Sequence, residues 1–134
     1  MNKKIILTND APSPIGPYNQ AILINNTLYI SGQIPLTPKM NLIENDLNNE
    51  VKQVMENLGA ILNAAKMEFT NVVKSTIYLD NMDNFEKVNK IYGQYFDNKL
   101  APARETVAVK TLPKNVRVEI SMIAYRWNHV LVSI

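Results

Sequence analysis

The stretch Pro102-Ala103-Arg104-Glu105-Thr106-Val107, followed after a short turn by Val118-Glu119-Ile120, is the part of the sequence from which the fold and the function can be worked out. Both runs are typical of β-strands. Side chains of a strand point alternately to its two faces, so Arg104 and Thr106 share one face and Glu105 lies on the other. The two runs thus place one arginine, one hydroxyl and one carboxylate on strands. An arginine and a glutamate on adjacent strands are most often an ordinary ion pair, and that interpretation stays open at this point.

The length of 134 residues is that of one domain, and we expect a single domain over residues 1–134. The absence of cysteine excludes disulfides, thiolate nucleophiles and thiolate zinc sites. A single histidine, His129, leaves no cluster for a metal and no histidine-based triad. The net charge of +2 is too small to indicate nucleic-acid binding, and no apolar run approaches the roughly 20 residues that span a bilayer.

The first third of the chain predicts a strand, a stiff loop and a hairpin. Residues 3–8 form the strand, and the loop that follows holds Tyr18 at a defined angle, because prolines fix its backbone. Residues 21–24 and 27–31 pair across Asn25-Asn26 as a hairpin. At its end, Gly32 permits a close approach beside the Ser31 hydroxyl, and a simple turn is the alternative. For Tyr18, a half-buried aromatic is the alternative to a role in a pocket.

Two amphipathic helices are predicted in the middle of the chain. The first runs from Asp46 to Lys66, since its apolar residues recur at helical spacing. A strand follows over residues 72–79. The second helix opens on a capping box at Asp83-Asn84-Phe85-Glu86 and continues to about Asn98. Asn89 lies beside its apolar stripe, where it either bonds to nearby backbone or sits at the edge of a cleft.

The order strand, hairpin, helix, strand, helix, strand, strand predicts an α+β fold with two helices on one face of a mixed sheet. In the last strand, over residues 116–125, Ile123 and Tyr125 share a face with Glu119. A second face that is partly apolar favours burial against other subunits. We therefore expect a closed homo-oligomer with this face at the interface.

The chain resembles the YjgF/RidA family of small reactive-intermediate deaminases over essentially its full length. Each matching stretch is short, but their order and spacing are specific. The stretches are Pro14-Ile15-Gly16-Pro17-Tyr18-Asn19-Gln20-Ala21, Ser31-Gly32-Gln33-Ile34-Pro35, Val54-Met55-Glu56-Asn57-Leu58, Phe85-Glu86-Lys87-Val88-Asn89, Pro102-Ala103-Arg104, and Leu112-Pro113 with Val118-Glu119-Ile120.

This resemblance implies a chorismate-mutase-like protomer, a homotrimer with a site at each subunit interface, and hydrolysis of 2-imino acids or their enamine tautomers to 2-keto acids and ammonia. The substrates implied are 2-iminobutanoate and 2-iminopropanoate, and no metal or organic cofactor is expected. A guanidinium suits the substrate carboxylate, and a carboxylate can activate water. The resemblance implies the following roles: catalytic Arg104, Glu119 and Thr106; substrate-binding Tyr18, Ser31, Gly32, Asn89 and Arg104.

Two features depart from the family pattern. Glu105 stands where a small residue is usual; by alternation it points away from Arg104, whereas a bulge in the strand would let the two pair. The tail over residues 127–134 extends beyond many members, as an added strand or an interface arm. We expect no nucleic-acid or membrane partner and a cytoplasmic location, with an organellar one left open. The rival hypotheses are a non-enzymatic sensor or carrier of small carboxylates and an RNA-directed or chaperone role.

Overall fold

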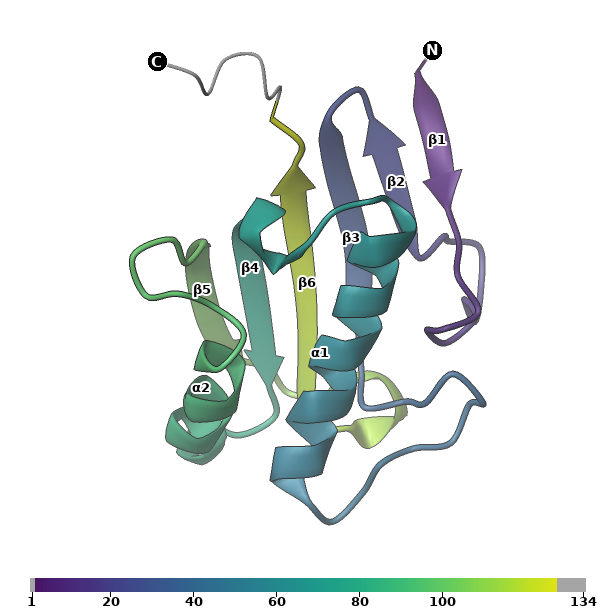
Figure 1. Cartoon of the computed structure of the whole chain (residues 1–134). Helices are drawn as coiled ribbons and strands as arrows, with labels where there is room; N and C mark the ends of the chain where they lie inside the picture. Colours follow the sequence, from purple (N-terminus) through teal and green to yellow (C-terminus); the bar gives the residue numbers. More distant parts are fainter. Residues whose placement is uncertain (1, 128–134) are drawn as a thin grey trace.

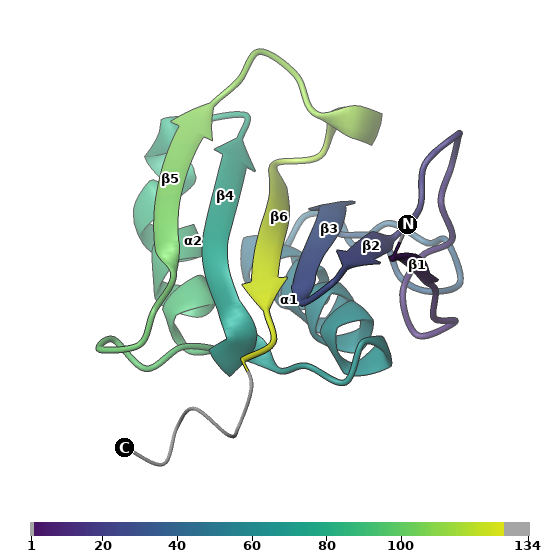
Figure 2. The same ribbon diagram turned by 90° about the horizontal axis from the view of Figure 1, so that it is seen from above.

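A six-stranded mixed sheet forms the frame of the protein in this computed structural model, which describes residues 2–127 (Figure 1). Its spatial order is β1-β2-β3-β6-β4-β5, and Figure 2 shows the strands side by side in that order. Only β4 and β5 pair in parallel; the other neighbours are antiparallel. The strands are β1 (Lys3–Ile6), β2 (Ala21–Ile24), β3 (Thr27–Gln33), β4 (Val72–Leu79), β5 (Ala103–Ala108) and β6 (Val118–Tyr125).

The predicted hairpin is confirmed. Strands β2 and β3 pair antiparallel, and Asn25 takes the left-handed conformation, with φ 54°, that a tight hairpin turn requires. The pairing of β3 with β6 is interrupted by a bulge between Ile30 and Gln33. Ser31 and Gly32 therefore lie near the C-terminal end of β3, where its hydrogen-bonded pairing with β6 is interrupted.

Helix α1 (Leu47–Ala64) closely matches the prediction for residues 46–66. Asp46 caps its N-terminus, because its side chain accepts a hydrogen bond from the backbone N–H of Asn49 at 3.2 Å. The apolar stripe that the spacing predicted is buried against the sheet: Leu47, Val51, Val54, Leu58, Ile61, Leu62 and Ala65. Helix α1 thus supplies most of the core on its side of the sheet.

Helix α2 (Phe85–Gly93) connects the parallel strands β4 and β5 and packs on the same face of the sheet as α1. The predictions of its ends were wrong. Asn81, not Asp83, makes the capping contact before it, since its Oδ1 accepts from the N–H of Asp83 at 2.9 Å. The helix stops at Gly93 instead of Asn98, because glycine is a poor helix former and the aromatic residues that follow pack on Phe69 outside the helix.

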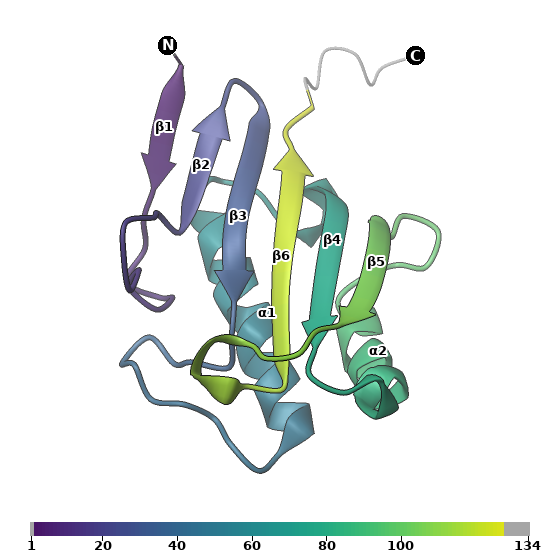
Figure 3. The same ribbon diagram turned by 180° about the vertical axis from the view of Figure 1, so that it is seen from behind.

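The other face of the sheet is open in Figure 3, where the strands lie in front of both helices. Directly paired residues point to the same face, so Ile5, Ile22, Tyr29 and Ile123 form one apolar row across four strands. Ile5 is 55% exposed and Tyr29 is 48% exposed. This confirms the prediction of a partly apolar second face. The homo-oligomer that we expect to cover it stays a prediction.

Helices that could cross a membrane are absent from residues 2–127, since neither helix there is long and apolar enough. The predictions for His129 and for the tail over residues 127–134 fall almost entirely outside the described residues. Trp127, the last described residue of the chain, lies beside Tyr125, with ring centroids 6.0 Å apart.

Candidate functional site

Arg104 lies on β5, one of the two edge strands of the sheet, and points toward helix α2. One of its terminal guanidinium nitrogens donates a hydrogen bond to Asn89 Oδ1 at 2.7 Å. The guanidinium carbon lies 5.1 Å from the ring centroid of Tyr92 and 5.8 Å from that of Phe85. These distances are in the range of cation–π contacts. The guanidinium is therefore held in one orientation by three side chains of α2.

The spacing along α2 explains this arrangement. Phe85, Asn89 and Tyr92 are separated by four and three residues, so they lie on one face of the helix. The parallel β4–α2–β5 connection places that face over β5. Tyr92 is itself fixed, because its hydroxyl donates to Ser75 Oγ at 2.9 Å, and burial raises the pKa of its phenol. Asn89 thus has a side-chain partner, Arg104, which the sequence did not reveal.

Thr106 shares the face of Arg104 on β5, as the alternation predicted. Its Oγ1 is buried and has no hydrogen-bond partner among the described residues. A buried hydroxyl without a partner is uncommon in folded proteins. This unpartnered hydroxyl is covered within the protomer and lies on the same face of β5 as Arg104.

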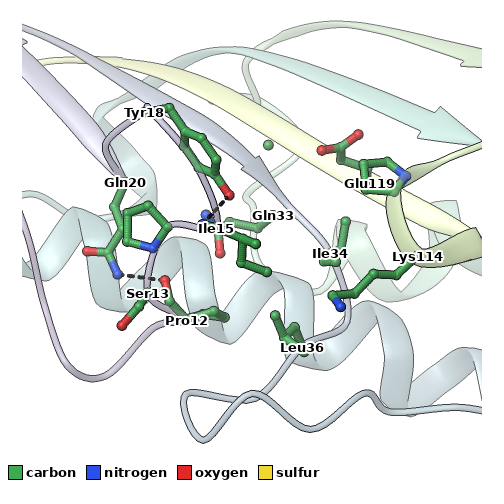
Figure 4. A pocket seen from close by; sticks show the side chains of 13 residues that line it. Pro12, Ser13, Ile15, Tyr18, Gln20, Gln33, Ile34, Leu36, Lys114 and Glu119 are labelled. Atoms are coloured by element: carbon green, nitrogen blue, oxygen red, sulfur yellow. Dashed lines mark hydrogen bonds between the residues drawn. The ribbon is translucent and has the colours of Figure 1, made fainter.

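Glu119 lies on the opposite face of the sheet, in a cavity of about 410 Å³ (Figure 4). Glu119 and Lys114 approach this cavity from one end, and Tyr18 and Ser13 stand at the other end. Most of the wall between them is apolar. The lining residues are Pro12, Ser13, Pro14, Ile15, Tyr18, Gln20, Gly32, Gln33, Ile34, Leu36, Pro113, Lys114 and Glu119.

The carboxylate of Glu119 has neither an ion-pair nor a hydrogen-bond partner within residues 2–127. Burial therefore acts on it without compensation and raises its pKa above the usual value for glutamate. A partly desolvated carboxylate with a raised pKa is a stronger base than an ordinary one and is suited to accept a proton from water.

The proline-rich loop before β2 forms the far wall of the cavity. Tyr18 folds back on this loop, because its hydroxyl oxygen accepts from the N–H of Ile15 at 3.1 Å. The Tyr18 hydroxyl can still donate its own proton. Gln20, which is buried, ties the loop to the sheet by donating to the carbonyl of Pro12 at 2.9 Å and accepting from the N–H of Thr8 at 2.8 Å. The hydrogen bonds of Gln20 thus stiffen the loop in addition to its prolines.

Gly32 lines the same cavity, whereas Ser31 does not. The Ser31 hydroxyl donates to the backbone carbonyl of Asn19 at 2.6 Å, and its N–H donates to the carbonyl of Gln20 at 2.9 Å. In this structure Ser31 therefore anchors the end of the Tyr18 loop, and its hydroxyl retains only acceptor capacity for a ligand.

Arg104 and Glu119 do not form the cross-strand ion pair that the sequence left open. Strand β4 lies between their strands, and Glu119 is paired with Tyr78 while Arg104 is paired with Ser75. Their side chains also project to opposite faces of the sheet. The interpretation as neighbouring strands was wrong, because the parallel β4–β5 pairing makes β5 an edge strand two positions from β6.

Glu105 points away from Arg104, as alternation predicted, and no bulge brings the two together. Its carboxylate forms an ion pair with Lys74 at 3.1 Å and accepts from Thr76 Oγ1 at 2.6 Å. These contacts lower the pKa of Glu105. The departure from the family pattern therefore falls on the open face and leaves the surroundings of Arg104 unchanged.

Several residues that lie near Arg104 or near Glu119 were not among the site residues predicted from the sequence. Phe85 and Tyr92 belong to the apolar stripe of α2, and their spacing around Asn89 places all three on one face of the helix. Lys114 lies in a left-handed conformation, with φ 56°, on the turn before β6, and no pattern pointed to it. Residues 2–127 hold no group of three or more His, Cys, Asp or Glu side chains placed to bind a metal ion.

Comparisons with known proteins match most of the chain. The family model described as "Endoribonuclease L-PSP" matches residues 8–126. A RutC family protein of a Synechocystis species is 52% identical over 92% of this chain and 97% of its own length. The 2-iminobutanoate/2-iminopropanoate deaminase of Homo sapiens is 46% identical over 91% of this chain and 89% of its own length. The crystal structure of E. coli TdcF with bound serine superposes with a TM-score of 0.87 at 37% identity, covering 92% of this chain and 99% of that one.

Proposed function

Because the chain belongs to the RidA/YjgF/L-PSP family, we propose that it hydrolyses reactive 2-imino acids, or their enamine tautomers, to 2-keto acids and ammonia. Relatives named 2-iminobutanoate/2-iminopropanoate deaminase, at about 46% identity, support this reaction for the chain. The proposed site combines Arg104, Thr106 and Asn89 of one protomer with Glu119, Tyr18, Ser31 and Gly32 of a neighbour.

One observation carries the proposal: the two halves of the site lie on opposite faces of the sheet. Arg104 is oriented at the free edge of the sheet by Asn89, and Glu119 stands unpaired in a cavity on the open face. One protomer does not bring the two side chains together, whereas a second copy with its β5 edge against the cavity would. The exposed apolar row, which lies on the same face of the sheet as Glu119, favours such a neighbour. A closed ring of three copies would repeat this contact at each interface.

In this site Arg104 binds the substrate carboxylate. Its guanidinium presents paired donors in a plane, which match two carboxylate oxygens, and it stays charged at any working pH. The contact with Asn89 and the ring of Tyr92 fix that plane before substrate arrives. Because the Arg104 side chain is already held in place, it loses less conformational entropy when the substrate binds.

Glu119 acts on the water that attacks the C=N carbon. It accepts a proton from the water as the C–O bond forms, which gives a carbinolamine. The carboxylic acid then protonates the nitrogen, the C–N bond breaks, and the proton of the hydroxyl passes to the departing ammonia as the keto group forms. Ammonium and the 2-keto acid leave, and Glu119 returns to its charged form. A protonated imine is already electrophilic, so the chain's own residues suffice for these steps.

The apolar wall of the cavity, which includes Ile15 and Ile34, would accept the substrate's side chain. A cavity of about 410 Å³ is larger than a methyl or ethyl group requires. A series of imines with side chains of increasing length, generated in place from amino acids by an amino-acid oxidase, tests both the reaction and this placement. We expect keto acid and ammonia to form faster than in buffer alone. Rates equal to the uncatalysed background for every imine would refute the proposed function.

Mixing two inactive variants tests whether the site is shared. In oligomers assembled from equal amounts of Arg104→Ala and Glu119→Gln chains, about a quarter of shared sites regain both wild-type residues. We therefore expect unfolding and refolding the mixture to restore up to about a quarter of wild-type activity. The unmixed variants carried through the same treatment are the control. No restored activity from a mixture that contains hetero-oligomers would place both residues' roles within one protomer.

A second candidate function is the binding of small amino or keto acids without turnover, and the E. coli TdcF structure, which has bound serine, favours it. Arg104 would serve both functions, and Glu119 would serve only hydrolysis. Calorimetric binding of serine or 2-ketobutanoate with no acceleration of imine hydrolysis would favour this alternative.

A further inference from the structure

Gly32 is in unusually close contact with Glu119. A β-carbon built on Gly32 would lie 2.4 Å from Glu119 Oε2, 2.8 Å from Cδ and 3.0 Å from Cγ, and these are its three nearest neighbours. Contacts below 3.0 Å are not tolerated by real β-carbons, so any side chain at position 32 displaces Glu119 or itself. The Gly32 backbone does not lie in the left-handed region, so its conformation does not require glycine. The three nearest atoms all belong to Glu119, so it is the position of Glu119 that requires glycine here.

The bulge in β3 lies next to this contact. The register shift between Ile30 and Gln33 breaks the regular pairing with β6 next to Gly32. The side chain of Glu119 lies against Gly32, and its carboxylate has no hydrogen-bond or ion-pair partner within residues 2–127. Hydrogen bonds thus do not hold this carboxylate, so its position depends on what it packs against.

We propose that Gly32 is a positioning residue whose missing side chain lets the Glu119 carboxylate lie flat against β3, at the wall of the cavity. The contact fixes the carboxylate by shape and shields it from water without neutralising it. This role differs from direct contact between Gly32 and a ligand. Its kinetic consequences rest on the proposed imine hydrolysis, whereas its structural consequences do not.

The groups around Glu119 are consistent with packing, and not hydrogen bonding, setting the position of its carboxylate. The titratable groups that face it are Tyr78, its pair partner on β4, Lys114 at the same end of the cavity, and Tyr18 at the other end (Figure 4). None of them comes within ion-pair or hydrogen-bond distance of its carboxylate. Burial is accordingly the cause of its raised pKa.

Replacing Gly32 with alanine tests the proposal kinetically, with Gly93→Ala as the matched control. A β-carbon at Gly93, on the exposed end of α2, meets nothing within 4 Å. We expect Gly32→Ala to lower kcat on the order of a hundredfold with KM nearly unchanged, because a displacement of about 1 Å from productive geometry costs that much. Gly93→Ala should keep wild-type kcat and KM. Wild-type kcat in Gly32→Ala would overturn the proposal.

A double-mutant cycle with Glu119→Ala separates positioning from any other role of Gly32. Glu119→Ala removes the three atoms nearest to the new β-carbon, so adding Gly32→Ala should cause no further loss of activity or of melting temperature. A further loss of kcat in the double variant would show that Gly32 acts independently of Glu119. If Gly32→Ala alone fails to fold, folding of the double variant supports the proposal, and failure of both refutes it.

Titration of Glu119 by carbon-13 NMR gives a readout that does not need activity. We expect a pKa above the usual glutamate value in the wild type, and a lower pKa, close to that value, in Gly32→Ala, because the displaced carboxylate meets water. The same pKa in both proteins would overturn the positioning role. A shifted pKa in a protein that hydrolyses no imine would uphold the contact and refute only the proposed function.

Discussion

The two halves of the proposed site hold their charged groups in opposite ways. At the β5 edge, Arg104 has a hydrogen-bond partner at 2.7 Å and two aromatic rings within 6 Å. In the cavity on the other face, the Glu119 carboxylate has no polar partner within residues 2–127 and rests against Gly32. One charge is bonded in place and the other is placed by shape alone.

This difference fits the tasks that we assign to the two groups. A group that binds a substrate carboxylate benefits from fixed donors and never has to release a proton. A group that accepts and returns a proton must keep its lone pairs free and its pKa near the working pH. An ion pair between Arg104 and Glu119 would have lowered the pKa of Glu119 and weakened it as a base. Within one protomer, their separation onto opposite faces of the sheet prevents this ion pair.

The largest expected effect is that of Arg104→Ala. Loss of the charge-assisted contact to the substrate carboxylate should lower kcat/KM on the order of a thousandfold, with the oligomer intact by light scattering. Arg104→Lys keeps the charge but loses the planar fork, and it should recover only part of the loss. An unchanged kcat/KM in Arg104→Ala would remove Arg104 from the site.

Glu119→Gln tests the other half. The amide has nearly the same shape as the carboxylate but cannot accept a proton, so kcat should fall by about a hundredfold to a thousandfold while KM changes little. In the wild type, kcat/KM should fall as the pH drops through the raised pKa of Glu119, because only the charged form acts as a base. This acid limb should be absent from the variant. A rise in KM alone would make Glu119 a binding residue.

Asn89→Ala asks how much the fixed orientation of Arg104 contributes. The guanidinium loses its hydrogen bond but keeps the rings of Phe85 and Tyr92, so we expect KM to rise about tenfold, which corresponds to roughly 1.4 kcal/mol. Asn89→Asp is the informative companion, because an added negative charge beside Arg104 should weaken binding of the substrate carboxylate further. Equal KM values for wild type and both variants would contradict an orienting role.

The sequence predicted the layers of the fold better than it predicted which residues lie next to one another in the site. Helical spacing is a local signal, and it predicted the buried stripe of α1. Strand alternation correctly separated Glu105 from Arg104. The order of strands is not local: nothing in the two runs of residues reveals that β4 lies between β5 and β6. The end of α2 was missed for a similar reason, because Tyr95 and Phe96 leave the helix to pack on Phe69, a distant residue.

Glu105→Ala should have the smallest effect on imine hydrolysis, because Glu105 belongs to neither half of the proposed site. Its carboxylate lies on the open face, bonded to Lys74 and Thr76, with no contact to Arg104 or to the cavity. We expect kcat and KM for imine hydrolysis within about twofold of wild type, since exposed ion pairs contribute little. The same variant separates catalysis from assembly, because Glu105 stands on the face that we expect to be covered. Weaker association by analytical ultracentrifugation with unchanged kcat would place Glu105 at the interface, whereas a large loss of kcat in intact oligomers would show that the residue acts on the site after all.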